Sequence, residues 1–126
     1  MEHIILPHPC DGTFYKDWTL SDWLLKVCEE TGEAVKAKKV YQKALSDYLT
    51  ACSCLHNEVN DRLQEAQNAR HELCKELTDV ITASTSALAF LGADLDERQR
   101  LQKEINDSNA SRDGGRRFQE GEPHEG

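Results

Sequence analysis

The amino-acid sequence predicts an all-α fold, and three observations carry this prediction. Long stretches are rich in Ala, Leu, Glu, Lys and Gln, which are strong helix formers. The chain contains only 3 prolines, so few positions interrupt a helix. Apolar residues recur at intervals of three or four over most of residues 20–105. At 126 residues, the chain suits a single domain with a modest hydrophobic core.

The first expected elements are an irregular lead-in and a long helix. Residues 1–17 show no sustained period and contain Pro7, Pro9 and Gly12, so we expect a lead-in without regular structure. Thr19 or Ser21 can cap the helix that follows. Its apolar positions recur at helical spacing through about residue 43.

Three further helices are expected downstream. The apolar period continues over residues 44–67, and residues 69–91 form the most regular stretch, with Gly92 as its stop. Asp94 or Asp96 can cap a last helix that runs to about residue 109. We therefore expect a helical domain over 18–113. Residues 114–126 are too polar to bury apolar surface, which predicts a mobile tail.

Charge and composition narrow the range of partners. The net charge of −8 argues against a nucleic acid, whose phosphates require a basic face. No stretch approaches the roughly 20 apolar residues of a membrane span, and residues 1–7 lack the pattern of a signal peptide. With an odd number of cysteines, 5, the chain is expected to be reduced and cytoplasmic. Because its core is small, we expect a homo-oligomer, either a homodimer or a homotetramer.

Two acidic pairs occupy equivalent positions on two of the expected helices. On a helical wheel at about 100° per residue, Glu30 lies at the margin of the apolar stripe and Glu33 about 60° to its polar side. Glu76 and Asp79 have the same relation to their own apolar stripe. If the two helices pack through their apolar faces, these four carboxylates converge on one rim.

Four converging carboxylates repel one another and lose hydration, so protons or cations must neutralise them. Oxygen-only ligation suits Mg²⁺ or Mn²⁺, and facing helices can build such a centre inside a bundle. The alternative is that these are solvated acidic side chains paired with neighbouring lysines, which is common in acidic helices. Spacing alone leaves both interpretations open.

Three motifs resemble the MazG-like group of all-α nucleoside triphosphate pyrophosphohydrolases. Residues 26–37 (KVCEETGEAVKA) hold its Glu-Glu-x-x-Glu, and residues 72–83 (ELCKELTDVITA) hold its Glu-x-x-Asp. Residues 109–118 (NASRDGGRRF) are similar to its terminal Asn-x-x-Arg followed by Gly and Phe. The interval between the acidic motifs, 42 residues (34–75), is longer than in the smallest members. Residues 44–67 are therefore expected to be an added or extended helical segment.

The resemblance implies a four- to five-helix bundle, completed by oligomerisation, and a chemistry. Members cleave a nucleoside triphosphate between the α and β phosphates and release the monophosphate and pyrophosphate, which cleanses nucleotide pools. The implied Mg²⁺ ligands, with Mn²⁺ as a substitute, are Glu30, Glu33, Glu76 and Asp79. Glu29 is implied as a further ligand or as the group that orients the attacking water.

Substrate contacts are expected from both ends of the match. Lys26 lies one turn before Glu30 and is the expected phosphate contact, the alternative being a simple salt bridge. Asn109 and Arg112 are expected to close over the triphosphate, with Asn106 as an alternative to Asn109. Trp18 is the candidate to stack on the nucleobase, because Trp23 falls on the buried arc.

Two rival functions stay open at this point. One is phosphoribosyl-ATP pyrophosphohydrolase, a relative of the same group that uses the same acidic logic. The other is a non-catalytic helical interaction module whose acidic residues are merely solvated. Release of pyrophosphate from nucleoside triphosphates distinguishes the expected enzyme from both.

Overall fold

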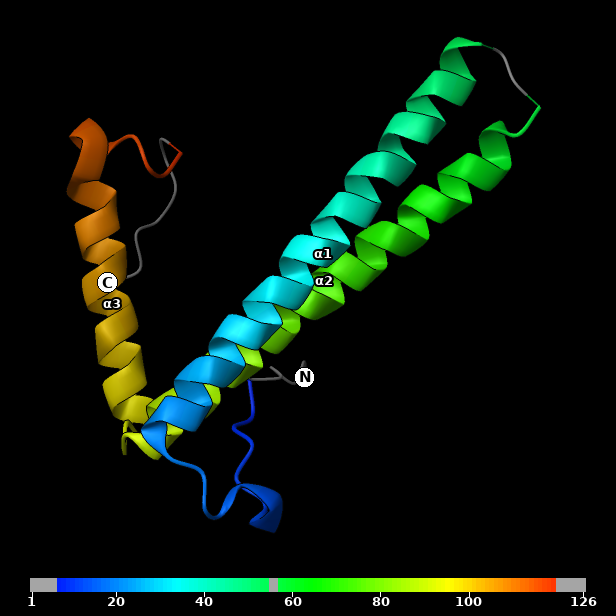
Figure 1. The fold of residues 1–126 in the computed structure, drawn as a ribbon. Coiled ribbons are helices and arrows are strands. Elements are labelled where there is room, and N and C mark those ends of the chain that lie inside the picture. Colours follow the sequence, from blue (N-terminus) through cyan, green and yellow to red (C-terminus); the bar gives the residue numbers. More distant parts are fainter. Residues whose placement is uncertain (1–6, 55–56, 120–126) are drawn as a thin grey trace, which may run out of the picture. The chain divides into compact units, whose positions relative to one another are not determined.

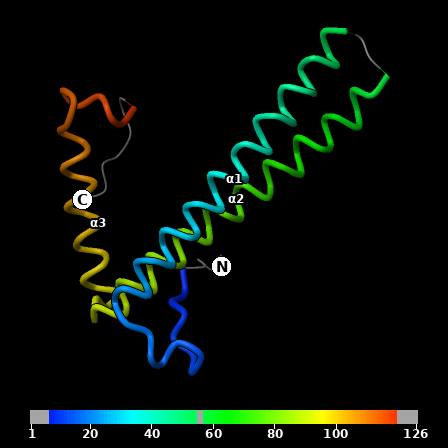
Figure 2. Tube along the Cα trace, in the orientation of Figure 1, coloured from blue at the N-terminus to red at the C-terminus, as the bar shows by residue number. Residues whose placement is uncertain are grey.

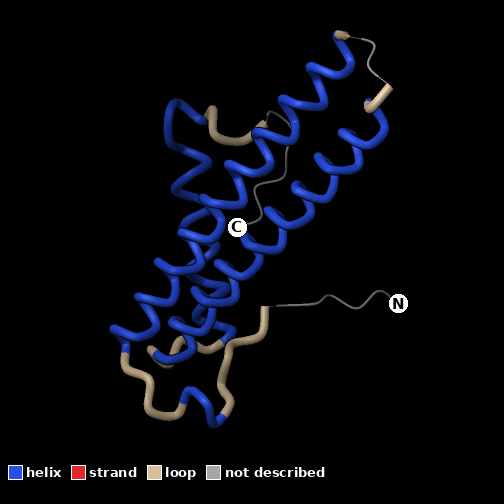
Figure 3. The backbone as a smooth tube through the Cα atoms, turned by 45° about the vertical axis from the view of Figure 1, so that its right-hand side comes forward, coloured by secondary structure: helices blue, strands red, loops and turns tan. Residues whose placement is uncertain are grey.

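A computed structural model describes residues 7–54 and 57–119 of the chain (Figure 1). Within these residues every regular element is helical, as Figure 3 shows, so the predicted all-α class is confirmed. The elements, in chain order, are the 3₁₀ helix η1 (Thr13–Tyr15), the α-helices α1 (Leu20–Ser53), α2 (Val59–Phe90) and α3 (Leu95–Ser111), and the 3₁₀ helix η2 (Arg112–Gly115).

The start of α1 follows from a local capping box. The Thr19 side chain accepts a hydrogen bond from the backbone N–H of Asp22, at 3.2 Å, and the Asp22 carboxylate accepts one from the backbone N–H of Thr19, at 2.8 Å. This reciprocal pair satisfies two backbone donors that a helix start leaves unpaired. Thr19 is therefore the cap, not Ser21.

The number and bounds of the helices differ from the prediction. The described residues hold three α-helices where four or five were expected. α1 passes through residue 43 without a break and ends at Ser53, and α2 begins at Val59, so the expected separate segment 44–67 is divided between them. No Gly or Pro occurs over residues 33–58, so nothing in that stretch stops a helix, and Asn57 falls in the turn instead.

Helices α1 and α2 run antiparallel and side by side as a hairpin (Figures 1 and 2). Most of their buried residues are alanines: Ala34, Ala51, Ala66, Ala83 and Ala87. Small side chains let two helix backbones approach closely, but they bury little apolar surface. Among the described residues, the one large buried side chain is Trp23, at the end of the hairpin where α1 begins. The buried core of the described hairpin therefore consists of small side chains and one aromatic group.

The end of α2 and the start of α3 confirm two predicted signals. Gly92 has a φ of 80°, and its N–H donates to Ala89 O while the N–H of Ala93 donates to Leu88 O. This is a Schellman motif, which needs a residue with positive φ and so favours glycine. The Asp94 carboxylate then caps α3 by accepting from the N–H of Glu97, at 2.9 Å.

The chain divides into two compact units, Met1–Ala87 and Leu88–Gly126. The first holds η1, α1 and all of α2 except its last turn, and the second holds α3 and η2. The predicted single domain over 18–113 crosses this division and stays a prediction. Residues 1–6 of the predicted lead-in and 120–126 of the predicted tail lie outside the described residues.

Candidate metal centre

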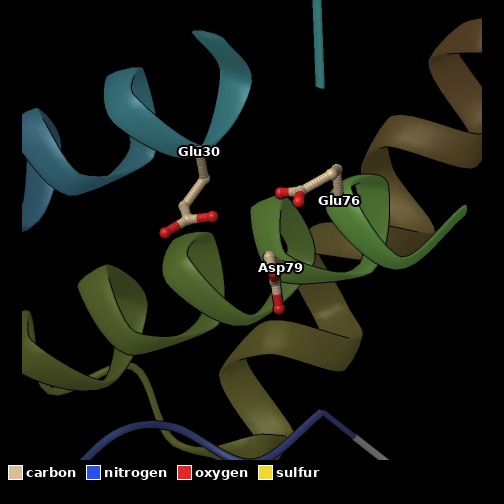
Figure 4. A group of neighbouring side chains, drawn as sticks. All are labelled: Glu30, Glu76 and Asp79. Carbon is tan, nitrogen blue, oxygen red and sulfur yellow. The ribbon is translucent and has the colours of Figure 1, made fainter. Parts of the chain in front are cut away.

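Three carboxylates from the two hairpin helices come together. One oxygen atom each from Glu30 on α1 and from Glu76 and Asp79 on α2 lie within 4.8 Å of one another. Figure 4 shows Glu30 reaching from α1 toward α2, where Glu76 turns its carboxylate toward it and Asp79 follows on the same helix. We call these three residues the acidic cluster. Their convergence is what the two matching helical wheels predict.

Lys26 supplies a positive charge at the edge of the cluster. Its Nζ atom lies 3.0 Å from Glu30 Oε1 and 3.9 Å from Glu29 Oε2. The hydrogen bond to Glu30, together with the negative charges of Glu30 and Glu29, raises the pKa of Lys26. The side chain of Glu30 is only 16% exposed, so this pair is better shielded from solvent than an ordinary surface ion pair.

The carboxyl group of Glu76 has a raised pKa in the acidic cluster. Desolvation raises the pKa of its carboxyl group, and the nearby charges of Asp79, Glu33 and Glu30 raise it further. A raised pKa means that the ionised form is disfavoured where Glu76 stands. A proton or a cation that neutralises the cluster therefore stabilises this arrangement.

The donor set of the cluster fits a hard divalent cation. Three carboxylates drawn from two helices offer oxygen ligands only, the set that Mg²⁺ and Mn²⁺ prefer over softer metals. Three protein ligands also leave coordination positions for water and for phosphate oxygens. The residues present therefore fit Mg²⁺, although exposed acidic groups of this kind are common without a metal.

Two of the predicted carboxylates stand outside the cluster. Glu33, predicted as a fourth ligand, lies 3.6 Å from Lys36 Nζ and is exposed. Its charge still contributes to the raised pKa of Glu76. Glu29 is 71% exposed and faces Lys26 rather than the other carboxylates. The structure therefore brings together three of the four predicted ligands.

A small pocket of about 180 Å³ adjoins the acidic cluster. Glu30 and Asp79 line it together with Lys26, and Cys10 and Tyr15, which precede α1, also belong to its lining. We call this cavity the Glu30 pocket. It is smaller than the roughly 300–1,000 Å³ of a typical small-molecule site. It can therefore enclose only part of a nucleotide.

Aromatic side chains gather beside the Glu30 pocket. Trp23, 4% exposed, stacks on Tyr15 with a centroid distance of 5.1 Å and an interplanar angle of 29°. Trp18, the predicted base platform, packs against Trp23 at 4.6 Å and edge-on against Tyr15 at 4.8 Å. Tyr15 and Trp23 line the pocket, whereas Trp18 contacts both of these rings and is not among the lining residues. The role of Trp18 as a stacking partner of a base stays a prediction.

The predicted terminal contacts belong to the second compact unit. The Asn109 side chain accepts a hydrogen bond from Arg117 Nη1, at 2.9 Å, and Arg117 Nε donates to Asp113 Oδ2, at 2.9 Å. Arg112 follows α3 directly and is exposed. Asn109 is thus engaged with Arg117 within its own unit, and the expected closure of Asn109 and Arg112 over a triphosphate stays a prediction.

The sequence interpretation missed several residues of the Glu30 pocket. Thr82 and Ala83 line it, and both lie three or four positions after Asp79, so helical spacing could have placed them beside that residue. Cys10 and Tyr15 carry no such signal, because the segment that contains them has no period. Their position depends on tertiary contacts.

Comparisons with known proteins identify no relative of this chain. A scan against protein-family models, a search of curated proteins and a search of solved structures give no significant match to this chain. Separately, none of the described helices has both the length and the apolarity that crossing a membrane requires.

Proposed function

We propose that this chain is a Mg²⁺-dependent nucleoside triphosphate pyrophosphohydrolase. It cleaves ribo- or deoxyribonucleoside triphosphates between the α and β phosphates and releases the monophosphate and pyrophosphate, as a nucleotide-pool cleansing enzyme of the cytoplasm. The observation that carries the proposal is the convergence of Glu30, Glu76 and Asp79 beside a pocket that also contains Lys26. These residues come from the two acidic motifs among the three that carry the sequence resemblance.

The roles of the side chains follow from their chemistry. Glu30, Glu76 and Asp79 would hold Mg²⁺, with Mn²⁺ as a substitute, and Glu33 would join them by turning away from Lys36. When bound, the ion supplies neutralisation of triphosphate charge and activation of water. No nucleophilic side chain is needed for this chemistry.

Lys26 and Glu29 are the proposed contacts with the phosphates and with the attacking water. The Lys26 ammonium group, at the edge of the cluster, would donate to a phosphate oxygen. The Glu29 carboxylate is exposed and would orient the attacking water and accept its proton, or else serve as a further ligand. Trp18 would stack on the base, and Asn109 and Arg112 would bind phosphate oxygens.

We also propose that the functional form is a homodimer or homotetramer whose subunits complete a helical bundle of the MazG-like type. The support is the composition of the core, which is mostly alanine, together with large apolar side chains that stay exposed on α1 and α2. A single hairpin buries little apolar surface, and a second copy would cover these side chains.

The decisive experiment is a substrate panel. The purified chain is incubated with Mg²⁺ and each common ribo- and deoxyribonucleoside triphosphate, and pyrophosphate release is measured. We expect hydrolysis of at least one triphosphate, dependence on the metal, and loss of activity by at least a hundredfold in Glu30→Gln and Asp79→Asn. Glu72→Gln, which changes an exposed carboxylate four residues before Glu76, serves as the matched control and should retain activity.

The same panel separates the rival functions. Turnover of phosphoribosyl-ATP with none of the nucleoside triphosphates would identify a phosphoribosyl-ATP pyrophosphohydrolase. Absence of pyrophosphate from every substrate, with the helical circular dichroism spectrum intact, would favour a non-catalytic helical interaction module. Full activity in both Glu30→Gln and Asp79→Asn would remove the metal-site proposal.

A further inference from the structure

The segment of residues 7–19, here called the N-terminal segment, is fastened to the hairpin by a buried hydroxyl group. The backbone N–H of Cys10 donates to Ser86 Oγ on α2, at 2.9 Å. Ser86 is only 2% exposed, and its own hydroxyl hydrogen goes to Thr82 O, also at 2.9 Å. The Ser86 hydroxyl thus donates its hydrogen within its own helix, while its oxygen accepts from the N–H of a residue 76 positions away.

A second attachment lies at the other end of the N-terminal segment. Tyr15 stacks on the buried Trp23 of α1, and Trp18 packs on the same indole. Such aromatic pairs contribute beyond the apolar area that they bury. The segment is therefore held at Cys10 through α2 and at Tyr15 through α1. Figure 2 shows the path of the segment past the end of the hairpin.

The two points of attachment coincide with the wall of the Glu30 pocket. Cys10 and Tyr15 are the residues of the N-terminal segment that line this cavity, together with Lys26, Glu30 and Asp79. Without the segment, the ion pair of Lys26 and Glu30 would face solvent on that side. Because water screens charges, removal of this segment would weaken the binding of any charged ligand in the Glu30 pocket.

We infer that the N-terminal segment is a wall of the substrate site and that Ser86 is the positioning residue that holds this wall against the acidic cluster. The inference rests on the proposed function for the identity of the ligand, a triphosphate. It assigns a role to a segment in which the sequence shows no motif. Ser86 itself would touch neither the metal nor the substrate.

The test compares Ser86→Ala with a matched control, Thr85→Ala. Thr85 is also buried and makes the same kind of bond within the helix, from its hydroxyl to Ile81 O at 2.8 Å. It makes no bond to Cys10, so Thr85→Ala removes a buried hydroxyl without releasing the N-terminal segment. Both variants introduce alanine, a strong helix former, so α2 should remain helical.

The first readout is the rate at which iodoacetamide alkylates each cysteine, followed by peptide mass spectrometry. We expect Ser86→Ala to speed alkylation of Cys10 about five- to tenfold, because its N–H loses its acceptor. The exposed Cys28 and Cys74 serve as internal references and should not change. In the wild-type chain, Mg²⁺ with tripolyphosphate should slow alkylation of Cys10 alone.

The second readout is the steady-state kinetics on whichever triphosphate the panel shows to be turned over fastest. We expect Ser86→Ala to raise KM by about five- to tenfold with little change in kcat, since the wall affects binding and not the reacting groups. Thr85→Ala should leave both parameters near their wild-type values.

Separate outcomes would overturn the inference and the proposed function. Equal alkylation of Cys10 in wild type and Ser86→Ala, or no protection of Cys10 by Mg²⁺ and tripolyphosphate, would overturn the inference. So would an unchanged KM in Ser86→Ala. One outcome would overturn only the proposed reaction: no triphosphate is hydrolysed, yet Mg²⁺ with tripolyphosphate slows alkylation of Cys10 and Ser86→Ala speeds it. The N-terminal segment would then be part of a polyphosphate-binding site.

Discussion

Lys26 Nζ lies 3.0 Å from a carboxylate oxygen of Glu30, one helical turn further along α1. Glu30 is at the same time a member of the acidic cluster. In the absence of a metal, the ammonium group therefore offsets part of the negative charge that a cation would neutralise. Under the proposed function, Lys26 would compete with a metal ion for the charge of Glu30, and it would be free to contact a phosphate once the metal is bound.

The first prediction concerns Lys26→Met, which keeps the length of the side chain and removes its charge. Mn²⁺ should bind about two- to fivefold more tightly to this variant, because a partly exposed ion pair of this kind is worth up to about 1 kcal/mol. The kcat/KM for Mg²⁺-triphosphate should fall at least tenfold through loss of the phosphate contact. Metal binding is measured by titration calorimetry and turnover by pyrophosphate release.

Lys36→Met is the matched control for this change. Lys36 pairs with the exposed Glu33 at 3.6 Å, outside the cluster, so its loss should alter metal affinity less than Lys26→Met does. Equal metal affinity in wild type and Lys26→Met would show that the lysine does not compete with the ion.

The second prediction is a pH dependence that Glu76 controls. Its pKa is raised above the ordinary value of 4.5 in the folded chain, so the folded state binds more protons than the unfolded state just above that pH. This contribution to stability is fully present below pH 4.5 and is lost as pH rises through the folded pKa. In Glu76→Gln, which cannot titrate, the loss should be absent. Urea unfolding in EDTA, from pH 4 to pH 8, measures the difference.

Metal should reverse the order of the two proteins. Without metal at neutral pH, Glu76→Gln should be more stable than wild type, because it relieves the repulsion from Asp79 and Glu30. With excess Mg²⁺, wild type should become the more stable, since only the folded, intact cluster binds the ion. Glu72→Gln removes the smallest of the charges that raise the pKa of Glu76, so it should stabilise the metal-free protein less than Glu76→Gln does and should show no reversal with Mg²⁺. A wild type that stays less stable in Mg²⁺ would argue against a metal at Glu76.

The sequence predicted three of the helix ends and missed the turn between α1 and α2. Capping and stop signals at Thr19, Gly92 and Asp94 are local, and the structure uses each of them. The turn after Ser53 carries no comparable signal, because no glycine or proline marks it. The hydrophobic period alone does not say where a long helix stops, so the break was wrongly placed near residue 43.

The candidate site divides in the same way. Glu30, Glu76 and Asp79 lie on regular helices, where spacing determines the face on which a residue stands, and they meet as the wheels predict. The Glu33 side chain can turn toward the acidic cluster or toward Lys36, one turn away, and helical spacing does not decide between them. The hydrogen bond between Cys10 and Ser86 joins a segment without periodicity to a helix far along the chain, so residue spacing could not predict it.

The third prediction is that Gly32→Ala stabilises the protein. Gly32 lies inside α1, and a Cβ atom built on it meets nothing within 4 Å. Replacing an interior helical glycine by alanine should add about 0.5–1 kcal/mol to the free energy of unfolding, measured in urea. Turnover should stay unchanged, because Gly32 lies far around the helix from Glu30. A loss of stability would mean that another chain packs against this position.

The fourth prediction concerns apolar side chains on one side of the hairpin. Leu24 and Val35 lie about 120–140° around α1 from Glu30, and Leu77 and Ile81 about 100–140° around α2 from Glu76. Because the two helices are antiparallel and the two glutamates face each other, these four side chains stand on the same side. Leu24 is 52% exposed and Leu77 is 51% exposed. Exposed apolar side chains on one side of a hairpin are candidates for an interaction surface.

Leu24→Glu and Leu77→Glu should each convert the proposed homo-oligomer to monomers in sedimentation velocity. A carboxylate in an apolar interface forfeits up to about 3 kcal/mol of leucine burial and must also be desolvated. Leu25→Glu is the matched control, because Leu25 is 61% exposed but lies about 100° further around α1, off this side. Dissociation by Leu25→Glu alone would place the interface elsewhere on α1. A wild-type chain that sediments as a monomer at all concentrations would remove the proposed assembly.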